Sequence, residues 1–316
     1  MSPVTLTEAA WEIRNKHFGQ KIYFYTPLYL SNYCVNNCLY CNFRRSNAQL
    51  MRESLSLQDA LREARAIASR GIKRITLVTG EMPWEVVGEG ITKFVRELRV
   101  ANFFQYISGN FGALPFNAFE DLARAGLDSY QIFQETYDRG VFVLMHPKSP
   151  KGNYDWRFDT PRRALQAGIP TVGMGILVGL APFDCEVEAL SRHIIAIENE
   201  FPRRVQLINL PRLQFAYGAV LSRVPFPVQD DAFLRAIGDL RVAFPDMGIA
   251  FTTREKPSLR DRALQYGVTH LSVESRTTVG GYADPKPEER GQFHLGDRRT
   301  VFHLRQVLDN VGLCAE

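Results

Sequence analysis

The chain has 316 residues, of which 45% are hydrophobic and 23% are charged, and its formal net charge is +4. This is an ordinary globular composition, and the length suits one large domain or two small ones. The basic residues are spread along the chain, and no stretch approaches about 18 consecutive apolar residues. A nucleic-acid-binding surface and a membrane-spanning segment are therefore not expected.

The first 20 residues predict an amphipathic helix. Acidic residues lie among its apolar ones, and it lacks the apolar core of a secretory signal peptide. The five cysteines are too few and too unevenly spaced for a disulfide framework, and three of them share one short motif. A reducing, cytoplasmic location is expected.

Strand-like and helix-like stretches alternate over residues 21–316, without a linker or a repeat. The strands are expected at 21–30, 75–81, 103–110, 129–135, 171–180, 204–210, 248–253 and 270–273. The helices are expected at 56–71, 86–100, 117–126, 161–168, 185–201, 230–244, 258–266 and 300–312. About eight β-then-α repeats predict one α/β domain, a parallel (βα)8-type TIM-like barrel. A doubly wound sheet is the alternative, because a series of segments does not prove closure.

The candidate functional residues follow predicted strands. A cysteine-rich loop at 34–41 follows the first strand, Gly80 and Glu81 follow the second, Glu135 the fourth and Arg254 the seventh. In a parallel barrel these strand ends share one face, where active sites lie. We therefore expect these residues to surround one site.

The cysteine loop carries Cys34, Cys38 and Cys41 in a C-x3-C-x2-C pattern. Three thiolates are one ligand short of the four that close a [4Fe-4S] cluster or a structural zinc site. The motif therefore predicts a cluster with one iron atom open to a small molecule. The alternatives are a zinc site completed by a distant histidine, or three unrelated buried thiols.

This spacing resembles that of the radical S-adenosylmethionine (SAM) superfamily, in which SAM binds the open iron through its amino and carboxylate groups. Longer stretches are similar to its aromatic amino-acid lyase branch, which contains tyrosine and tryptophan lyases. They are PLYLSNYCVNNCLYCNFRRSN, LVTGE, FQETYDR, MHPKSPKGNYDWR, PRL, TTREKP, VGGYADP and QFHLGDRR. The resemblance extends from about residue 22 to residue 313.

The resemblance implies residues that bind SAM. Tyr40 would lie against the adenine, and the Thr79-Gly80-Glu81 segment would meet the amino group of SAM. Glu135 would reach the ribose or the amino group, and Arg163 would bind the carboxylate, since a guanidinium offers it a bidentate fork. The alternative for the last two residues is a structural ion pair, or an exposed helix face for Arg163.

The resemblance also implies residues that bind an amino-acid substrate. Arg254 would hold its carboxylate with Thr252 as a hydroxyl partner, although Glu255 could instead be the partner of this arginine. His193 would contact substrate, although packing or exposure is common for a single histidine on an amphipathic helix. Two substrate-binding positions depart from the family pattern: Asn209 and Gln214 replace a hydroxyl and a cation, so the substrate can differ.

The implied activity begins with reductive cleavage of SAM to a 5'-deoxyadenosyl radical by an electron from a flavodoxin or a ferredoxin. That radical abstracts hydrogen from tyrosine, and Cα–Cβ cleavage gives 2-iminoacetate and p-cresol. One alternative is another amino acid such as tryptophan. A second is sulfur insertion of the biotin-synthase type, which needs a second cluster that Cys185 and Cys314 are too few to hold. The third is a non-catalytic iron–sulfur scaffold or assembly partner.

Overall fold

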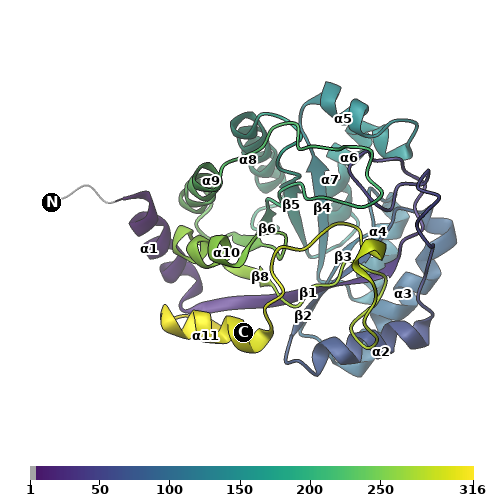
Figure 1. Ribbon diagram of the computed structural model, residues 1–316, viewed down its shortest axis with the longest axis horizontal. Helices are drawn as coiled ribbons and strands as arrows, with labels where there is room; N and C mark the ends of the chain where they lie inside the picture. The colour runs from purple at the N-terminus through teal and green to yellow at the C-terminus, as the bar shows by residue number, and fades with distance from the viewer. Residues whose placement is uncertain (1–4) are drawn as a thin grey trace.

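The computed structural model describes residues 5–316 and shows a closed barrel (Figure 1). Its eight main strands are parallel, and β1 pairs with both β2 and β8. The strands are β1 Lys21–Ser31, β2 Arg74–Thr79, β3 Tyr106–Asn110, β4 Ser129–Glu135, β5 Thr171–Ile176, β6 Val205–Asn209, β7 Gly248–Phe251 and β8 His270–Ser272. The predicted barrel is therefore confirmed, and the doubly wound sheet is wrong because β1 closes the ring.

A ring of helices surrounds the strands. Its members are α2 Leu57–Ala68, α3 Trp84–Ala101, α4 Phe116–Ala125, α7 Thr160–Gln166, α8 Phe183–Glu200, α9 Asp230–Ala243, α10 Pro257–Ala263 and α11 Val301–Asn310. Local signals set several ends: Ser56 caps α2 by accepting from the Asp59 N–H, and Gly126 ends α4 in the left-handed conformation. Among the helices of residues 5–316, none has the length and apolar character that a membrane crossing requires.

Several short elements were not expected from the sequence. They are α5 Arg139–Met145, α6 Tyr154–Phe158, β9 Cys314–Ala315 and the 3-10 turns η1 Pro150–Gly152 and η3 Glu288–Arg290, whereas the 3-10 turn η2 Leu264–Tyr266 continues α10 within the helix expected at 258–266. Such elements are too short to show a hydrophobic period. β9 pairs with the first residues of β1, so the end of the chain lies at the amino ends of the strands.

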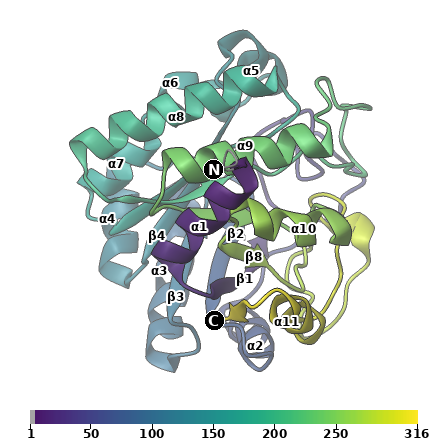
Figure 2. The ribbon, with the colours of Figure 1, turned by 90° about the vertical axis from the view of Figure 1, so that its left-hand side faces the viewer.

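The N-terminal helix α1 spans Leu6–Phe18 and lies across the barrel in Figure 2, in contact with α9 and η2. It begins with a capping box in which Thr5 and Glu8 bond to one another's backbone N–H groups. The first four residues of the predicted helix lie outside the described residues. The division into a helix over 1–20 and one barrel domain over 21–316 stays a prediction.

The first strand shows how the sequence builds both surfaces of the barrel. Ile22, Phe24 and Leu28 are buried in the core shared with the helices. Tyr25 and Tyr29 alternate with them and line a central cavity. The strand therefore packs its helices with one set of side chains and shapes the interior with the other.

Candidate functional site

The central cavity lies at the carboxyl ends of the strands, where the sequence predicted the site. All but two of the predicted site residues line it: Cys34, Cys38, Tyr40, Cys41, Thr79, Gly80, Glu81, Glu135, Asn209, Gln214, Thr252 and Arg254. The barrel thus brings together residues that are up to 220 positions apart in the sequence. The remaining two, Arg163 and His193, lie elsewhere.

The cysteine loop presents its three thiols to this cavity. The Asn36 N–H lies 3.4 Å from Cys34 Sγ, and the Phe43 N–H lies 3.3 Å from Cys41 Sγ. Both N–H groups donate to sulfur, which favours the thiolate form that binds iron. Burial nevertheless raises the pKa of Cys34 to about 11, with Glu81 adding to the shift. The thiols need a strong cation to become thiolates.

The cysteine loop packs closely against the second strand. The Val35 N–H donates to the Glu81 carbonyl at 2.9 Å, and the Gly80 N–H donates to the Ser31 carbonyl at 2.9 Å. A Cβ atom on Gly80 would lie 2.2 Å from the Tyr33 carbonyl oxygen. Glycine is therefore needed here because the two backbones touch.

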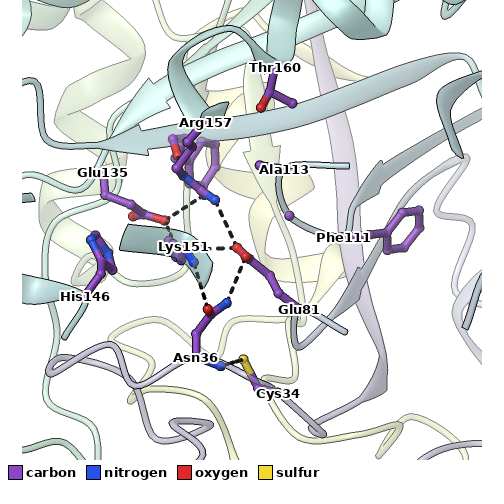
Figure 3. A network of polar contacts seen from close by, with 12 residues as sticks. Cys34, Asn36, Glu81, Phe111, Ala113, Glu135, His146, Lys151, Arg157 and Thr160 are labelled. Atoms are coloured by element: carbon purple, nitrogen blue, oxygen red, sulfur yellow. Dashed lines mark hydrogen bonds and ion pairs between the residues drawn. The ribbon is translucent and has the colours of Figure 1, made fainter. Parts of the chain in front are cut away.

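Four charged side chains form a buried network beside this loop (Figure 3). Lys151 Nζ lies 2.7 Å from Glu135 Oε1 and 3.6 Å from Glu81 Oε1. Arg157 joins the same carboxylates, at 3.0 Å from Glu81 and 3.1 Å from Glu135. Asn36 donates to Glu81 Oε2 at 2.9 Å. The network holds two positive and two negative charges, so it is balanced.

The equal number of positive and negative charges keeps all four side chains of the network ionised. Burial alone would raise the pKa of Glu81 and of Glu135, but Lys151 and then Arg157 outweigh it, so both pKa values lie below the usual range. Burial and Arg157 act to lower the pKa of Lys151, but the carboxylates and Cys38 raise it overall. All four groups are therefore charged at neutral pH.

Glu135 is also strained. It ends β4 with φ +71°, and the strand pairing shifts register between Phe133 and Glu135. A non-glycine residue in the left-handed region costs on the order of 1–3 kcal/mol and is concentrated at functional sites. The strain turns the carboxylate into the cavity toward Lys151 and Arg157.

A histidine orients Tyr40 in the cavity wall. His146 Nδ1 lies 2.6 Å from the Phe142 carbonyl, which can only accept, so the proton is on Nδ1. Nε2 then accepts the hydroxyl of Tyr40 at 2.8 Å. Burial, followed by Lys151 and Arg157, lowers the pKa of His146 to about 2, so the ring is neutral. This residue was not identified from the sequence.

Arg254 faces the cavity from the loop after β7 without a carboxylate partner among residues 5–316. Its guanidinium lies 3.4 Å from the centre of the Phe293 ring, and its NH1 is 3.4 Å from the Arg212 carbonyl. Glu255, the alternative partner, is instead held by Arg212, whose Nε lies 2.9 Å away. Burial lowers the pKa of Arg254. This cation is therefore available for an anion in the cavity.

Residues 28–194 match the Radical SAM superfamily, and residues 209–314 match the Biotin and Thiamin Synthesis associated domain. The first of these covers more than half of the chain. The chain belongs to the radical SAM superfamily. The two matched regions divide the barrel near β6, although their strands pair in one sheet.

Known relatives confirm the branch that the motifs indicated. The chain is 32% identical to 2-iminoacetate synthase of Escherichia coli (strain K12) over 311 residues, which are 98% of this chain and 80% of the relative. The crystal structure of HydG, a maturase of the [FeFe]-hydrogenase, matches with a TM-score of 0.92 at 32% identity, over 98% of this chain and 68% of that chain. Methylornithine synthase (PylB) shares the fold, with a TM-score of 0.80 at 19% identity over 98% of this chain and 88% of that one.

The cysteine loop of this radical SAM enzyme fits an iron–sulfur cluster. Among residues 5–316, no three His, Cys, Asp or Glu side chains are grouped as a single-ion site requires. In a cluster, by contrast, each thiolate binds a different iron atom, so Cys34, Cys38 and Cys41 need only surround a common space. Cys185 and Cys314 are exposed, and Cys314 lies at the opposite end of β1.

The structure does not bring Arg163 into the cavity. Its NH1 bonds to Asp159 at 2.8 Å, its NH2 bonds to the Trp156 carbonyl at 2.7 Å and to Thr160 at 3.0 Å, and its guanidinium stacks on the Trp156 ring. These contacts agree with a structural ion pair rather than a ligand contact. The role predicted for Arg163 thus has no geometric support.

The structure also places His193 outside the cavity. Its ring stacks on Phe158, with 3.8 Å between ring centres, and its Nδ1 lies 2.9 Å from the Tyr137 hydroxyl. Burial lowers its pKa to about 4. These contacts agree with the packing alternative for this histidine, and the substrate contact that the resemblance implied stays a prediction.

Lys151 and Arg157 were not identified from the sequence. Both lie between β4 and α7, in the MHPKSPKGNYDWR stretch that was used only for the resemblance. Two cations that follow the strand ending in Glu135 were the available signal. Arg157 is on α6, and its Nε also donates to the Phe133 carbonyl at 2.7 Å, which fixes its direction.

The two departures from the family pattern lie on the other side of the cavity. Asn209 ends β6, and its Nδ2 lies 3.2 Å from Gln131 Oε1. Gln214 lines the cavity from the loop after β6. These amides can donate and accept hydrogen bonds, so they suit a neutral polar group of a substrate.

Proposed function

We propose that the chain cleaves the Cα–Cβ bond of an aromatic amino acid, tyrosine first, to give 2-iminoacetate and p-cresol. The observation that carries the proposal is Arg254, a half-buried guanidinium that has no carboxylate partner among residues 5–316 and faces the same cavity as the three cysteines. The amino-acid carboxylate would be its missing partner. The relationship to 2-iminoacetate synthase supports this choice of reaction.

When bound, the cluster and SAM supply the radical that takes a hydrogen atom from the substrate, most directly from its amino nitrogen. Cys34, Cys38 and Cys41 would hold the cluster, and Tyr40, oriented by His146, would contact the adenine. Each of these side chains lines the cavity except His146, which lies behind Tyr40.

The charged network would receive the amino-acid end of SAM, with the Thr79-Gly80-Glu81 segment beside it. The SAM ammonium suits Glu135 and Glu81, and the SAM carboxylate suits Arg157 and Lys151. A zwitterion adds one charge of each sign, so the balance of the network is kept. Arg157 thus takes the role predicted for Arg163.

The substrate would lie between this network and Arg254. Thr252 lines the cavity beside that arginine and offers a hydroxyl. Asn209 and Gln214 would face the side chain of the substrate. Because they are neutral amides, a phenol or an indole N–H is a suitable partner, so tryptophan is the second substrate to test.

The test is an anaerobic assay of the reconstituted enzyme with SAM, a reductant and a panel of amino acids. We expect 5'-deoxyadenosine and p-cresol in equal amounts from tyrosine, and neither from a triple Cys34→Ala, Cys38→Ala, Cys41→Ala variant. Release of 5'-deoxyadenosine without a cleavage product from any amino acid would contradict the lyase assignment. A triple variant that retained its iron and sulfide would contradict the cluster site.

Iron analysis and SAM cleavage together distinguish this lyase from a sulfur-inserting enzyme and from a non-catalytic scaffold. One cluster of four irons per chain is expected. A sulfur-inserting enzyme would need a second cluster, and a scaffold would bind iron without cleaving SAM. The electron would come from a flavodoxin or ferredoxin in a reducing cytoplasm, where an oxygen-sensitive cluster persists.

A further inference from the structure

Three loops meet on the outer side of the cysteine motif and form one surface, which we call the loop patch. It consists of residues 33–52, 139–152 and 211–229. Leu39, between two of the cysteines, joins them: its N–H donates to the Met145 carbonyl at 3.0 Å, and its carbonyl accepts from the Val220 N–H at 2.8 Å. Arg44 Nε donates to the Gly218 carbonyl at 2.6 Å. The loop patch is therefore the protein surface directly outside the three thiols.

All charged residues of the loop patch are basic. Its segments hold eight arginines and lysines and no aspartate or glutamate, whereas the whole chain has 38 basic and 34 acidic residues. Lys151, Arg212 and Arg139 bind carboxylates from other segments. The ion pairs of residues 5–316 leave the exposed Arg45 and Arg223 without a carboxylate, and the exposed Lys148 as well. Their positive charge faces the solvent.

Large apolar side chains are exposed among these cations. On α5, Val143 and Leu144 are 59% and 63% exposed, and on the third segment Phe215, Tyr217 and Val220 are 65%, 53% and 58% exposed. Exposed apolar groups next to unpaired charge are typical of a protein-binding surface. Exposed apolar side chains together with unpaired cations favour a protein as the partner of this surface over a small anion.

Acidic residues border the ends of the three segments: Glu53 follows the first, Asp138 precedes the second, and Asp230 and Asp231 follow the third. Glu53, Asp230 and Asp231 form ion pairs with Lys286, Arg212 and Arg262, and Asp138 caps α5.

The turn η3 is a further acidic segment beside the loop patch. Asn42 Nδ2 donates to the Glu289 and Gly291 carbonyls at 2.9 and 2.6 Å, so η3 adjoins the cysteine loop. Its Glu288 binds Arg298 and is therefore neutralised. Glu289 is left at the edge, so the positive sign of the surface is kept.

We propose that the loop patch docks an acidic electron-carrier protein. The inference rests on the proposed function, because a radical SAM reaction consumes an electron. The carrier would lose one electron, the cluster behind Leu39 would gain it, and no bond or proton would change. Opposite charge speeds such encounters and fixes their orientation, while the apolar side chains add contact area. Electron-transfer interfaces are small, which suits a patch of three loops.

The test measures binding of reduced flavodoxin to the full-length enzyme by calorimetry, without amino acid, at low and high salt. We expect the triple variant Arg45→Glu, Lys148→Glu, Arg223→Glu to bind about tenfold or more weakly at low salt and to lose most of the salt dependence. The matched control is Lys93→Glu, Arg96→Glu, Arg235→Glu on α3 and α9, where all three residues are exposed. It changes the net charge equally and should bind within about twofold of wild type.

A second measurement separates docking from folding. Dithionite is a small anionic reductant that needs no docking surface, so at high salt, which screens its charge, it should reduce the cluster of all three proteins at the same rate. Equal weakening in the two triple variants would reduce the effect to net charge and overturn the proposal, as would unchanged binding in both. Self-association of wild type that the patch variant abolishes would assign the surface to a second copy of the chain. Loss of lyase activity leaves the binding result unaffected, so the two proposals fail separately.

Discussion

The two sides of the central cavity differ in whether their charged side chains form ion pairs. On one side Glu81 and Glu135 are each paired with Lys151 and Arg157. On the other side the guanidinium of Arg254 lies against the Phe293 ring and the Arg212 carbonyl, and the ion pairs of the described residues 5–316 give it no carboxylate. A balanced network is part of the folded structure before any ligand arrives, whereas an unpaired cation keeps a desolvation cost that an anion removes. We therefore expect the paired side to stabilise the fold before any ligand arrives, and Arg254 to be stabilised only when an anion binds beside it.

The largest effect is expected on the paired side. Arg157→Ala leaves two buried carboxylates with one cation, and breaking a buried ion pair in this way costs on the order of 3–5 kcal/mol. Urea unfolding of the SAM-free protein measures it. Arg157→Lys, which keeps the charge, is the control and should recover part of the loss. Equal stability of wild type and Arg157→Ala would show that the network is not a structural unit.

On the unpaired side, Arg254→Ala should leave the free energy of unfolding unchanged or slightly higher, because it removes an uncompensated cation. The affinity for tyrosine should fall by about 1.5–3 kcal/mol, roughly ten- to a hundredfold, through loss of a charge-assisted contact. Thermal unfolding with and without tyrosine gives both quantities. If tyrosine does not stabilise wild type and Arg254→Ala melts earlier, Arg254 is structural and the comparison fails.

The pH dependence of stability tests the paired side further. Burial, then Lys151 and Arg157, hold the pKa of His146 at about 2. Below about pH 6.5 the unfolded chain binds a proton there that the folded chain does not, so stability falls as pH falls. One such group contributes about 1.4 kcal/mol per pH unit. His146→Gln should reduce the slope between pH 4.5 and 6 by this amount, while His193 and His270, whose pKa values are also lowered, maintain the remainder. An unchanged slope would mean that His146 accepts a proton in the folded state.

The smallest effect is expected for Arg163→Ala. This variant tests whether Arg163 or Arg157, six positions earlier, binds the carboxylate of SAM. Arg163 bonds to Asp159 and Thr160 outside the cavity. SAM affinity should stay within about twofold of wild type, although some stability is lost with the side-chain contacts. Isothermal titration calorimetry measures the affinity for SAM of Arg163→Ala and of Arg157→Lys, and the variant with the weaker binding identifies the arginine that contacts SAM. A tenfold loss of affinity in Arg163→Ala would restore the role that the sequence suggested.

The strands and long helices were predictable because each has a hydrophobic period that its burial requires. Alternation in β1 and the helical spacing of α2 repeat often enough to be recognised. The helices α5 and α6, with seven and five residues, are shorter than that signal. Arg157 lies on α6, and this explains why the site predicted from the sequence was incomplete.

The direction in which a side chain points was the other feature that could not be predicted from the sequence. Arg157 and Arg163 are on one segment, and no local rule states which of them faces Glu81, which lies 76 positions before Arg157. An ion pair one helical turn apart holds Arg163 toward Asp159, four residues earlier. By contrast, the three cysteines could be placed from the sequence, because their spacing alone fixes a short loop after a strand.

The close fit of the cysteine loop into its surroundings has a consequence for the life of the enzyme. Val35 is bonded to Glu81 after β2, and Leu39 and Asn37 are bonded to Met145 and Ser149 in the segment between β4 and α7. Because these hydrogen bonds are independent of metal, we expect the loop to keep its shape without a cluster, unlike a zinc finger, whose chain folds only with its metal. Oxygen damage that strips the iron would leave an intact shell, and refilling would cost little chain entropy. We therefore expect that iron and sulfide added without oxygen can restore a damaged cluster without refolding of the chain.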